Sequence, residues 1–191
     1  MQPLTVDGTA DTEYLLVDPW LLPTASNPAR MQGAVDHLLE ALAYQTEPTR
    51  RAHLRSQIGF MLICLSRADE AVQMLQECAS TQQSLQYDRG LVATELRLTQ
   101  ALQATSQVSE ALGVGQVALS RCVAYPALCD LQHFAHQHLG KVNMQAGLYD
   151  QARHHLQTAL DFRLALSADE LVASTQAALS LLRRHAAKND A

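Results

Sequence analysis

Five histidines lie close together in the C-terminal half of the chain, and imidazole is a common metal ligand and proton carrier near neutral pH. They are His133, His136, His138, His154 and His155. On a helix, His133 and His136 could share a face, whereas His138 points elsewhere. In an antiparallel hairpin, His136 would lie about one helical turn (~5.4 Å) from the level of His154 and His155. We therefore expect two histidine groups on different faces and no metal site.

The four cysteines offer no second ligand set. Cys64, Cys78, Cys122 and Cys129 form no Cys-x-x-Cys pair, and none lies near the histidines with zinc-finger spacing. Cys78 occupies a position that is alanine in two related segments described below, which indicates a small, buried site. We expect a packed and unreactive thiol there.

Known catalytic motifs are missing. The sequence has no glycine-rich phosphate loop, no Gly-x-Ser-x-Gly and no His-Glu-x-x-His. The acidic pairs Asp69-Glu70 and Asp169-Glu170 lie at expected helix starts, where the helix dipole explains them. The sequence therefore predicts no enzyme, no cofactor and no catalytic residue.

Composition excludes further classes of function. The net charge of −5 argues against nucleic acid as a direct partner, because such binding needs lysine and arginine to neutralise phosphates. No apolar run approaches the ~18 residues that span a bilayer. The first ten residues lack a positive start followed by an apolar stretch. We expect a cytoplasmic protein that has no membrane partner.

Alanine, leucine and glutamine dominate the chain, and this composition predicts an all-α fold. Asn27-Pro28, Pro48, Pro126 and Gly147 mark helix boundaries. Ser66 and Ser167 are expected to cap the helices that follow them. No strand is predicted. About eight helices are expected, over residues 28–45, 48–65, 66–80, 90–104, 108–124, 127–145, 149–166 and 168–187.

Three segments share one spaced pattern and recur 40 and then 41 residues apart. The matching positions are Ile58, Leu98 and Leu139, then Ala71, Ala111 and Ala152, then Cys78, Ala118 and Ala159. A repeat of this length indicates stacked helical units. We expect one domain over 27–191 with repeats at approximately 50–87, 88–126 and 127–167, flanked by the first and last helices.

The third repeat resembles the tetratricopeptide repeat (TPR) signature. Its matching residues are Leu139, Gly140, Gly147, Tyr149, Ala152, Leu156, Ala159 and Leu160. Thr99, Ser66, Ser106 and Gly115 depart from the pattern in the first two repeats. The period exceeds the common 34 residues and is similar to that of bacterial regulatory TPR domains and kinesin light chains. The resemblance implies a right-handed helical solenoid of antiparallel helix hairpins.

In the TPR family, partners usually bind in a concave groove lined by the first helix of each pair. The resemblance places Ser56 and Phe60 where chaperone-binding members carry a clamp for a terminal carboxylate, so chaperone tails are not expected. Each groove residue has packing against the next repeat as its alternative role. The groove predicted here comprises His53, Gln57, Phe60, Ile63, Leu96, Gln100, Gln103, Phe134, Gln137, Lys141 and Met144, with Phe60, Phe134 and Met144 at least partly exposed; Ala177, Leu181 and Arg184 continue it.

Residues 1–26 form an apolar segment with the only tryptophan, Trp20. Because a solvated tail of this kind would expose an apolar patch, we expect it to be irregular but packed. We expect it to run against the helix beginning at Pro28 as a cap. The alternatives are a groove of the same chain, or a second subunit in a homodimer.

Together these features predict a non-catalytic scaffold that binds a protein or peptide in the groove of three TPR-like repeats. The alternative is a sensory or regulatory TPR domain of a larger or multi-component bacterial signalling or transcription-regulatory system.

Overall fold

The computed structural model describes residues 13–17 and 19–189, and over these residues the fold is almost entirely helical. Contacts divide the chain into two compact units, Met1–Gln107 and Val108–Ala191, which we call unit 1 and unit 2. Each unit is described by itself. Eight α-helices lie within the described residues, so the predicted all-α repeat fold is confirmed. The single domain over 27–191 stays a prediction.

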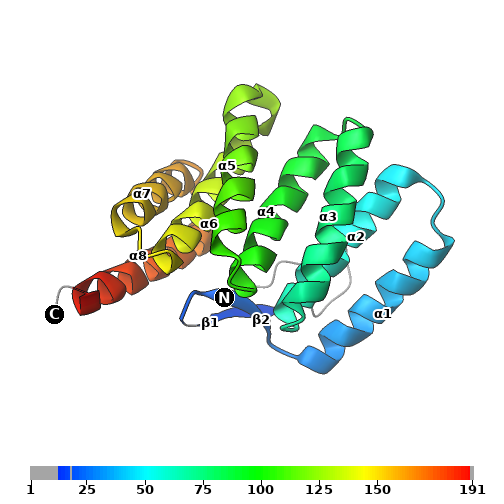
Figure 1. The fold of residues 1–191 in the computed structure, drawn as a ribbon, viewed down its shortest axis with the longest axis horizontal. Coiled ribbons are helices and arrows are strands. Elements are labelled where there is room, and N and C mark those ends of the chain that lie inside the picture. Colours follow the sequence, from blue (N-terminus) through cyan, green and yellow to red (C-terminus); the bar gives the residue numbers. More distant parts are fainter. Residues whose placement is uncertain (1–12, 18, 190–191) are drawn as a thin grey trace. The chain divides into compact units, whose positions relative to one another are not determined.

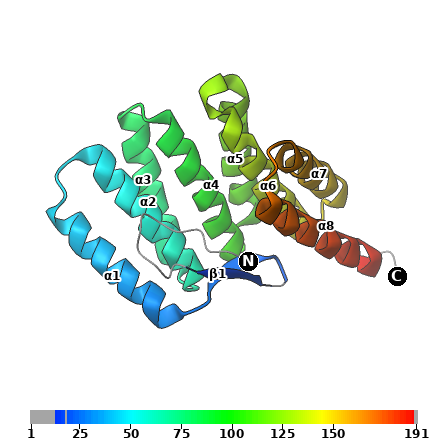
Figure 2. The same cartoon turned by 180° about the vertical axis from the view of Figure 1, so that it is seen from behind.

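Unit 1 contains four helices of equal length, α1 (Pro28–Tyr44), α2 (Pro48–Cys64), α3 (Ala68–Ser84) and α4 (Asp88–Ala104). They lie side by side in Figures 1 and 2, with α3 packed on both α2 and α4. The starts of α1 and α2 agree with the prediction because proline fits the first helical turn, where no backbone donor is needed. The Asn27 side chain caps α1 by accepting a hydrogen bond of 3.1 Å from the Arg30 amide.

Unit 2 contains α5 (Val108–Ala124), a 3₁₀ segment η1 (Pro126–Leu131), α6 (Gln132–Gln145), α7 (Tyr149–Ala165) and α8 (Asp169–Asn189). Helix α6 packs between α5 and α7, and α8 packs on α7. The helix predicted over 127–145 is therefore divided. Its first residues form the tighter 3₁₀ turn instead.

Five helices end in the same kind of turn, in which one residue adopts a positive φ of 53–75°. These residues are Ser66, Gln86, Ser106, Gly147 and Ser167. After α2, the Arg67 amide donates back to the Leu62 carbonyl at 2.9 Å, as expected of a left-handed C-terminal cap. The prediction that Ser66 and Ser167 begin the following helices is therefore wrong. Both residues terminate the preceding helix, because an N-cap needs extended backbone rather than a positive φ.

Glycine allows close helix packing at the same repeat position in both units. A Cβ atom at Gly59 would lie 2.6 Å from Leu75, and one at Gly140 would lie 2.6 Å from Leu156. No real side chain tolerates such distances, so the two helices of each hairpin approach more closely than any larger residue would allow. The close approach predicted at Gly140 is confirmed.

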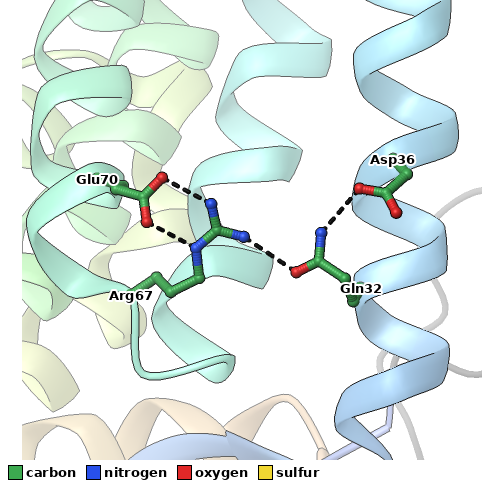
Figure 3. Close-up of polar contacts among 4 residues, drawn as sticks. All are labelled: Gln32, Asp36, Arg67 and Glu70. Atoms are coloured by element: carbon green, nitrogen blue, oxygen red, sulfur yellow. Dashed lines mark hydrogen bonds and ion pairs between the residues drawn. The ribbon is translucent and has the colours of Figure 1, made fainter.

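Polar side chains join α1 to the start of α3 (Figure 3). Arg67 binds both carboxylate oxygens of Glu70 through Nε and Nη2, each at 2.6 Å. Its Nη1 donates to Gln32 on α1 at 3.0 Å, and Gln32 donates to Asp36 at 2.8 Å. Because Arg67 and Glu70 are both substantially exposed, their ion pair stabilises the fold only weakly.

The N-terminal segment differs from its prediction. It forms a β-hairpin of β1 (Tyr14–Val17) and β2 (Leu22–Ala25), which pair antiparallel. Figures 1 and 2 both show it near the end of unit 1 where α2 and α4 terminate, and β2 packs on α2. The expected position along the helix beginning at Pro28 is therefore wrong for the described residues. The paired strands satisfy backbone hydrogen bonds that an irregular segment on a helix surface would leave unmade.

Candidate functional site

The predicted groove residues of unit 1 divide into exposed and buried sets. On α2, His53 is exposed and Phe60 is partly exposed, whereas Gln57 and Ile63 are buried. On α4, all three predicted residues are buried: Leu96, Gln100 and Gln103. Phe60 is therefore the accessible apolar anchor on this part of the predicted groove.

The protein already places one of its own side chains on that anchor. The ring of Tyr14, from β1, packs edge-on against Phe60, with 5.4 Å between ring centroids and an interplanar angle of 80°. This T-shaped geometry is a favoured arrangement for aromatic pairs. The surface around Phe60 thus accepts an aromatic side chain carried by an extended segment.

A chain of polar contacts lies one helical turn from Phe60 and connects three helices. The hydroxyls of Ser56 and Thr94 share a hydrogen bond of 2.8 Å. Arg97 donates from Nη1 to Ser56 Oγ at 2.6 Å. On α3, the Cys78 thiol donates to the Ala52 carbonyl and lies 3.6 Å from Thr94 Oγ1.

Arg97 is the functional candidate that the sequence analysis missed. Its side chain is partly buried, and burial lowers the pKa of its guanidinium. The signal was available, because Arg97 lies 40 residues after Gln57, which the prediction placed in the groove. We call the surface formed by the partly exposed Phe60 of α2 and Arg97 of α4, together with the buried Ser56 and Gln57 that lie next to them on α2, the α2/α4 face.

In unit 2, the predicted groove residues are mostly buried. Phe134 is partly exposed, but Gln137, Lys141 and Met144 are 4%, 2% and 1% exposed. The expectation that Met144 is partly exposed is therefore wrong. Its unbranched side chain fills the helix packing instead.

Buried Arg163 connects α6, α7 and α8. From the end of α7, its Nε donates to His133 Nδ1 at 3.2 Å and its Nη1 donates to Gln137 Oε1 at 3.1 Å. Nη1 also donates to the Leu171 carbonyl at 3.0 Å and to Thr175 Oγ1 at 2.6 Å. Its guanidinium lies 5.7 Å from the Phe134 ring centroid, a cation–π distance. Gln137 therefore has a structural contact within unit 2.

The positive charge of Arg163 affects its neighbours on α6. Burial, followed by the charge of Arg163, lowers the pKa of Lys141 to about 8. Burial, followed by the charges of Lys141 and Arg163, also lowers the pKa of His138 well below its ordinary value. His138 is therefore neutral at pH 7, while most Lys141 side chains remain charged.

The two histidine groups meet, contrary to the prediction. His136 Nδ1 on α6 lies 2.9 Å from His155 Nδ1 on α7. The prediction compared only the positions of the backbone atoms along the axis of the hairpin. Two imidazole side chains that extend towards each other can bridge an axial separation of about one helical turn. Among residues 13–17 and 19–189, no group of three His, Cys, Asp or Glu side chains is arranged to hold a metal ion.

A buried and a partly buried histidine in unit 2 should make the fold sensitive to acid. Burial, then the charge of Arg163, lowers the pKa of His133 to about 4, and burial, then the charge of His155, lowers the pKa of His136 to about 4. The unfolded chain takes up these protons near pH 6.5, before the folded chain does. The contribution of these two histidines to the free energy of unfolding should therefore be fully present above about pH 7 and be lost as the pH drops from about 6.5 to 4.

Urea unfolding at a series of pH values checks this expectation. Between about pH 6.5 and 4, His136→Gln should reduce the slope of the free energy of unfolding against pH, because it removes one of the titrating groups. The control, His37→Gln, changes an exposed histidine on α1 and should keep the wild-type slope. A His136→Gln profile parallel to that of the wild type would contradict the assignment.

Cys78 agrees with the prediction of a packed thiol, and Cys64 is a second buried thiol in unit 1. Cys78 is fully buried, and burial raises the pKa of its thiol. Burial also raises the pKa of Cys64 to about 12. Both thiols are therefore protonated at neutral pH and poor nucleophiles. Cys129, on η1, is exposed.

Comparison with solved structures identifies the fold. A crystal structure of a Podosopora anserina putative kinesin light chain with nearly identical TPR-like repeats has a TM-score of 0.58 and 17% identity, covering 84% of this chain and 89% of that one. A crystal structure of a variant of that protein gives the same score and identity, with coverage of 83% and 86%. The fold is that of TPR-like repeats. No protein-family model matches the sequence, and no curated protein matches it either.

The TPR-like fold accounts for the positions of Gly59, Gly140 and the alanines between paired helices. It does not by itself place a ligand. Within the described part of the chain, none of the TPR-like helices is both long enough and apolar enough to cross a membrane.

Proposed function

We propose that the protein is a non-catalytic scaffold that binds a peptide segment of a protein partner on the α2/α4 face. The observation that supports this proposal is the contact between Tyr14 and Phe60. A strand of the same chain already occupies the face with an aromatic side chain, so the partner should be an extended segment that presents a similar side chain.

The hairpin then acts as an internal competitor of the partner. Tyr14 is held near Phe60 by chain connectivity, which gives it a high effective concentration. A partner must displace this ring to reach Phe60. Loosening Tyr14 and truncating Phe60 should therefore change partner affinity in opposite directions.

We also propose that the face of α6 that carries Phe134 in unit 2 contributes to partner binding. There, Phe134 is partly exposed, as the groove prediction requires. Its contact with Arg163 gives Phe134 a structural role as well, so Phe60 is the cleaner position for a test.

Selection of random twelve-residue peptides displayed on phage against the full chain tests the proposal. Fluorescence anisotropy would then give the affinity of a selected peptide for each variant. Phe60→Ala should weaken binding at least about tenfold, equivalent to the loss of ~1.4 kcal/mol. Tyr14→Ala should strengthen binding, because the internal competitor is weakened.

Phe162→Ala is the matched control, because Phe162 is an exposed phenylalanine on α7 in unit 2. It should leave the affinity unchanged, and thermal melts should show that all three variants fold. Enriched peptides that bind Phe60→Ala as tightly as the wild type would contradict the proposal. So would a Tyr14→Ala variant that binds more weakly.

A further inference from the structure

Arg97 uses only part of its hydrogen-bonding capacity. A guanidinium carries five N–H donors, and the structure gives Arg97 one hydrogen bond, from Nη1 to Ser56 Oγ. No carboxylate among the described residues pairs with it. The side chain of Arg97 is partly buried, and this burial lowers the pKa of its guanidinium. A partly buried charge without a partner is energetically unfavourable, and pairing with an anion would stabilise it.

The unused edge of Arg97 has a preferred ligand geometry. Nη1 is bound to Ser56, and within the described part of the chain the structure gives no hydrogen bond from Nε or Nη2, which form the other edge of the guanidinium. Arg67 in the same unit uses this edge to bind both oxygens of Glu70 at 2.6 Å (Figure 3). Planar, two-point recognition of this kind is the strongest mode of arginine–carboxylate pairing.

Ser56 holds the guanidinium in position. Its oxygen accepts from Arg97, so its own hydrogen can be donated to Thr94 Oγ1, 2.8 Å away. Ser56 is 2% exposed and Thr94 is fully buried, so neither hydroxyl is free to reorient towards water. The arginine fork is thus fixed before any ligand arrives, which reduces the entropic cost of binding.

We propose that Arg97, positioned by Ser56, binds the side-chain carboxylate of an aspartate or glutamate in the partner peptide. This inference rests on the proposed function and adds the chemistry of its ligand. Ser56 and Phe60 are four residues apart on α2 and therefore neighbours on one helix face. The preferred peptide carries an acidic residue near its aromatic one.

A carboxylate fits this site better than a phosphate. The flat fork of one guanidinium matches two coplanar oxygens and neutralises one negative charge. A phosphate group carries close to two charges at pH 7 and would leave one uncompensated in a partly desolvated site. Arg55, whose charge acts with that of Arg97 on the Cys78 thiol, adds positive potential nearby.

NMR of the arginine Nε–H groups in the full chain tests the inference directly. The probes are acetyl-triglutamate amide, acetyl-triglutamine amide and inorganic phosphate, each added at constant ionic strength. The triglutamate peptide should shift the Arg97 signal to saturation, and the triglutamine peptide should not. The signal of Arg50, an exposed arginine on α2, is the internal reference and should move little.

Variants separate binding from folding. The arginine signal that disappears in Arg97→Lys is that of Arg97. This variant keeps the positive charge but lacks the planar fork, so its affinity for triglutamate should be lower. Backbone amide shifts measure that affinity. Arg97→Gln should reduce that affinity at least about tenfold. Ser56→Ala should weaken it less, whereas Ser80→Ala, at an exposed serine on α3, should have no effect.

Two results would overturn the assignment: no saturable shift of Arg97 with triglutamate, or an equal shift with triglutamine. Tighter binding of phosphate than of triglutamate would replace the carboxylate with a phosphate ligand. If selected peptides depend on Phe60 but bind Arg97→Gln normally, this inference alone fails. If Arg97 binds triglutamate but Phe60→Ala leaves the affinity for the selected peptides unchanged, only the proposed function fails.

Discussion

Replacing Arg163 with methionine should lower the free energy of unfolding by about 2–4 kcal/mol, because buried groups left without a hydrogen-bond partner cost ~1–3 kcal/mol each. Arg163 is 2% exposed and donates to side chains and backbone on α6 and α8. Methionine fills much of the same volume but donates nothing, so Gln137 Oε1 and His133 Nδ1 lose their partner. Losing a desolvated charge offsets only part of this cost.

Arg153→Met is the matched control on the same helix. Its ion pair with Asp150 is long, at 3.4 Å, and the two side chains are 61% and 94% exposed. Such a pair contributes at most ~1 kcal/mol and often nothing measurable. Chemical unfolding followed by circular dichroism compares the two variants. Equal midpoints for Arg163→Met and Arg153→Met would show that the Arg163 contacts do not hold the three helices together.

Replacing Ala152 with phenylalanine should destabilise the protein by about 1–3 kcal/mol through overpacking. Ala152 on α7 is fully buried, and α7 packs against α6 with Leu139 1% exposed. Little free space remains between the two helices, since even a Cβ at Gly140 would lie 2.6 Å from Leu156. A benzyl group therefore forces α6 and α7 apart.

Gln151→Phe places the same ring on the exposed side of α7 and serves as the control. It should change the melting temperature little. Thermal melts followed by circular dichroism make the comparison. If Ala152→Phe has the same melting temperature as the wild type, the assignment of position 152 to the tight seam of the TPR-like hairpin is wrong.

Local chemistry made much of the fold predictable. Proline in the first turn and the Asn27 cap define where α1 begins, whatever the helix later packs against. The recurrence of small residues every 40 or 41 positions indicated stacked hairpins, because the same seam must be filled in each repeat. Gly140 was correctly placed for the same reason, and Gly147 was correctly placed because a helix-ending turn with a positive φ favours glycine.

The β-hairpin was missed because its strands carry no clear signal of period two. Pro23 lies within β2, and proline in a run of residues argues against a strand. Pairing with β1 and packing on α2 outweigh that local preference. Only the folded structure shows that Tyr14 reaches Phe60.

The sequence by itself determined the helices, their repeat and the kind of residue at each seam, since these depend on contacts between neighbours in the chain. Only the tertiary structure decided the roles of the polar side chains. Arg163 meets His133 across 30 positions, and Arg97 meets Ser56 across 41. Whether a charged side chain is a structural link or an open binding site depends on which partners lie within about 3 Å, and helical periodicity carries no information about that.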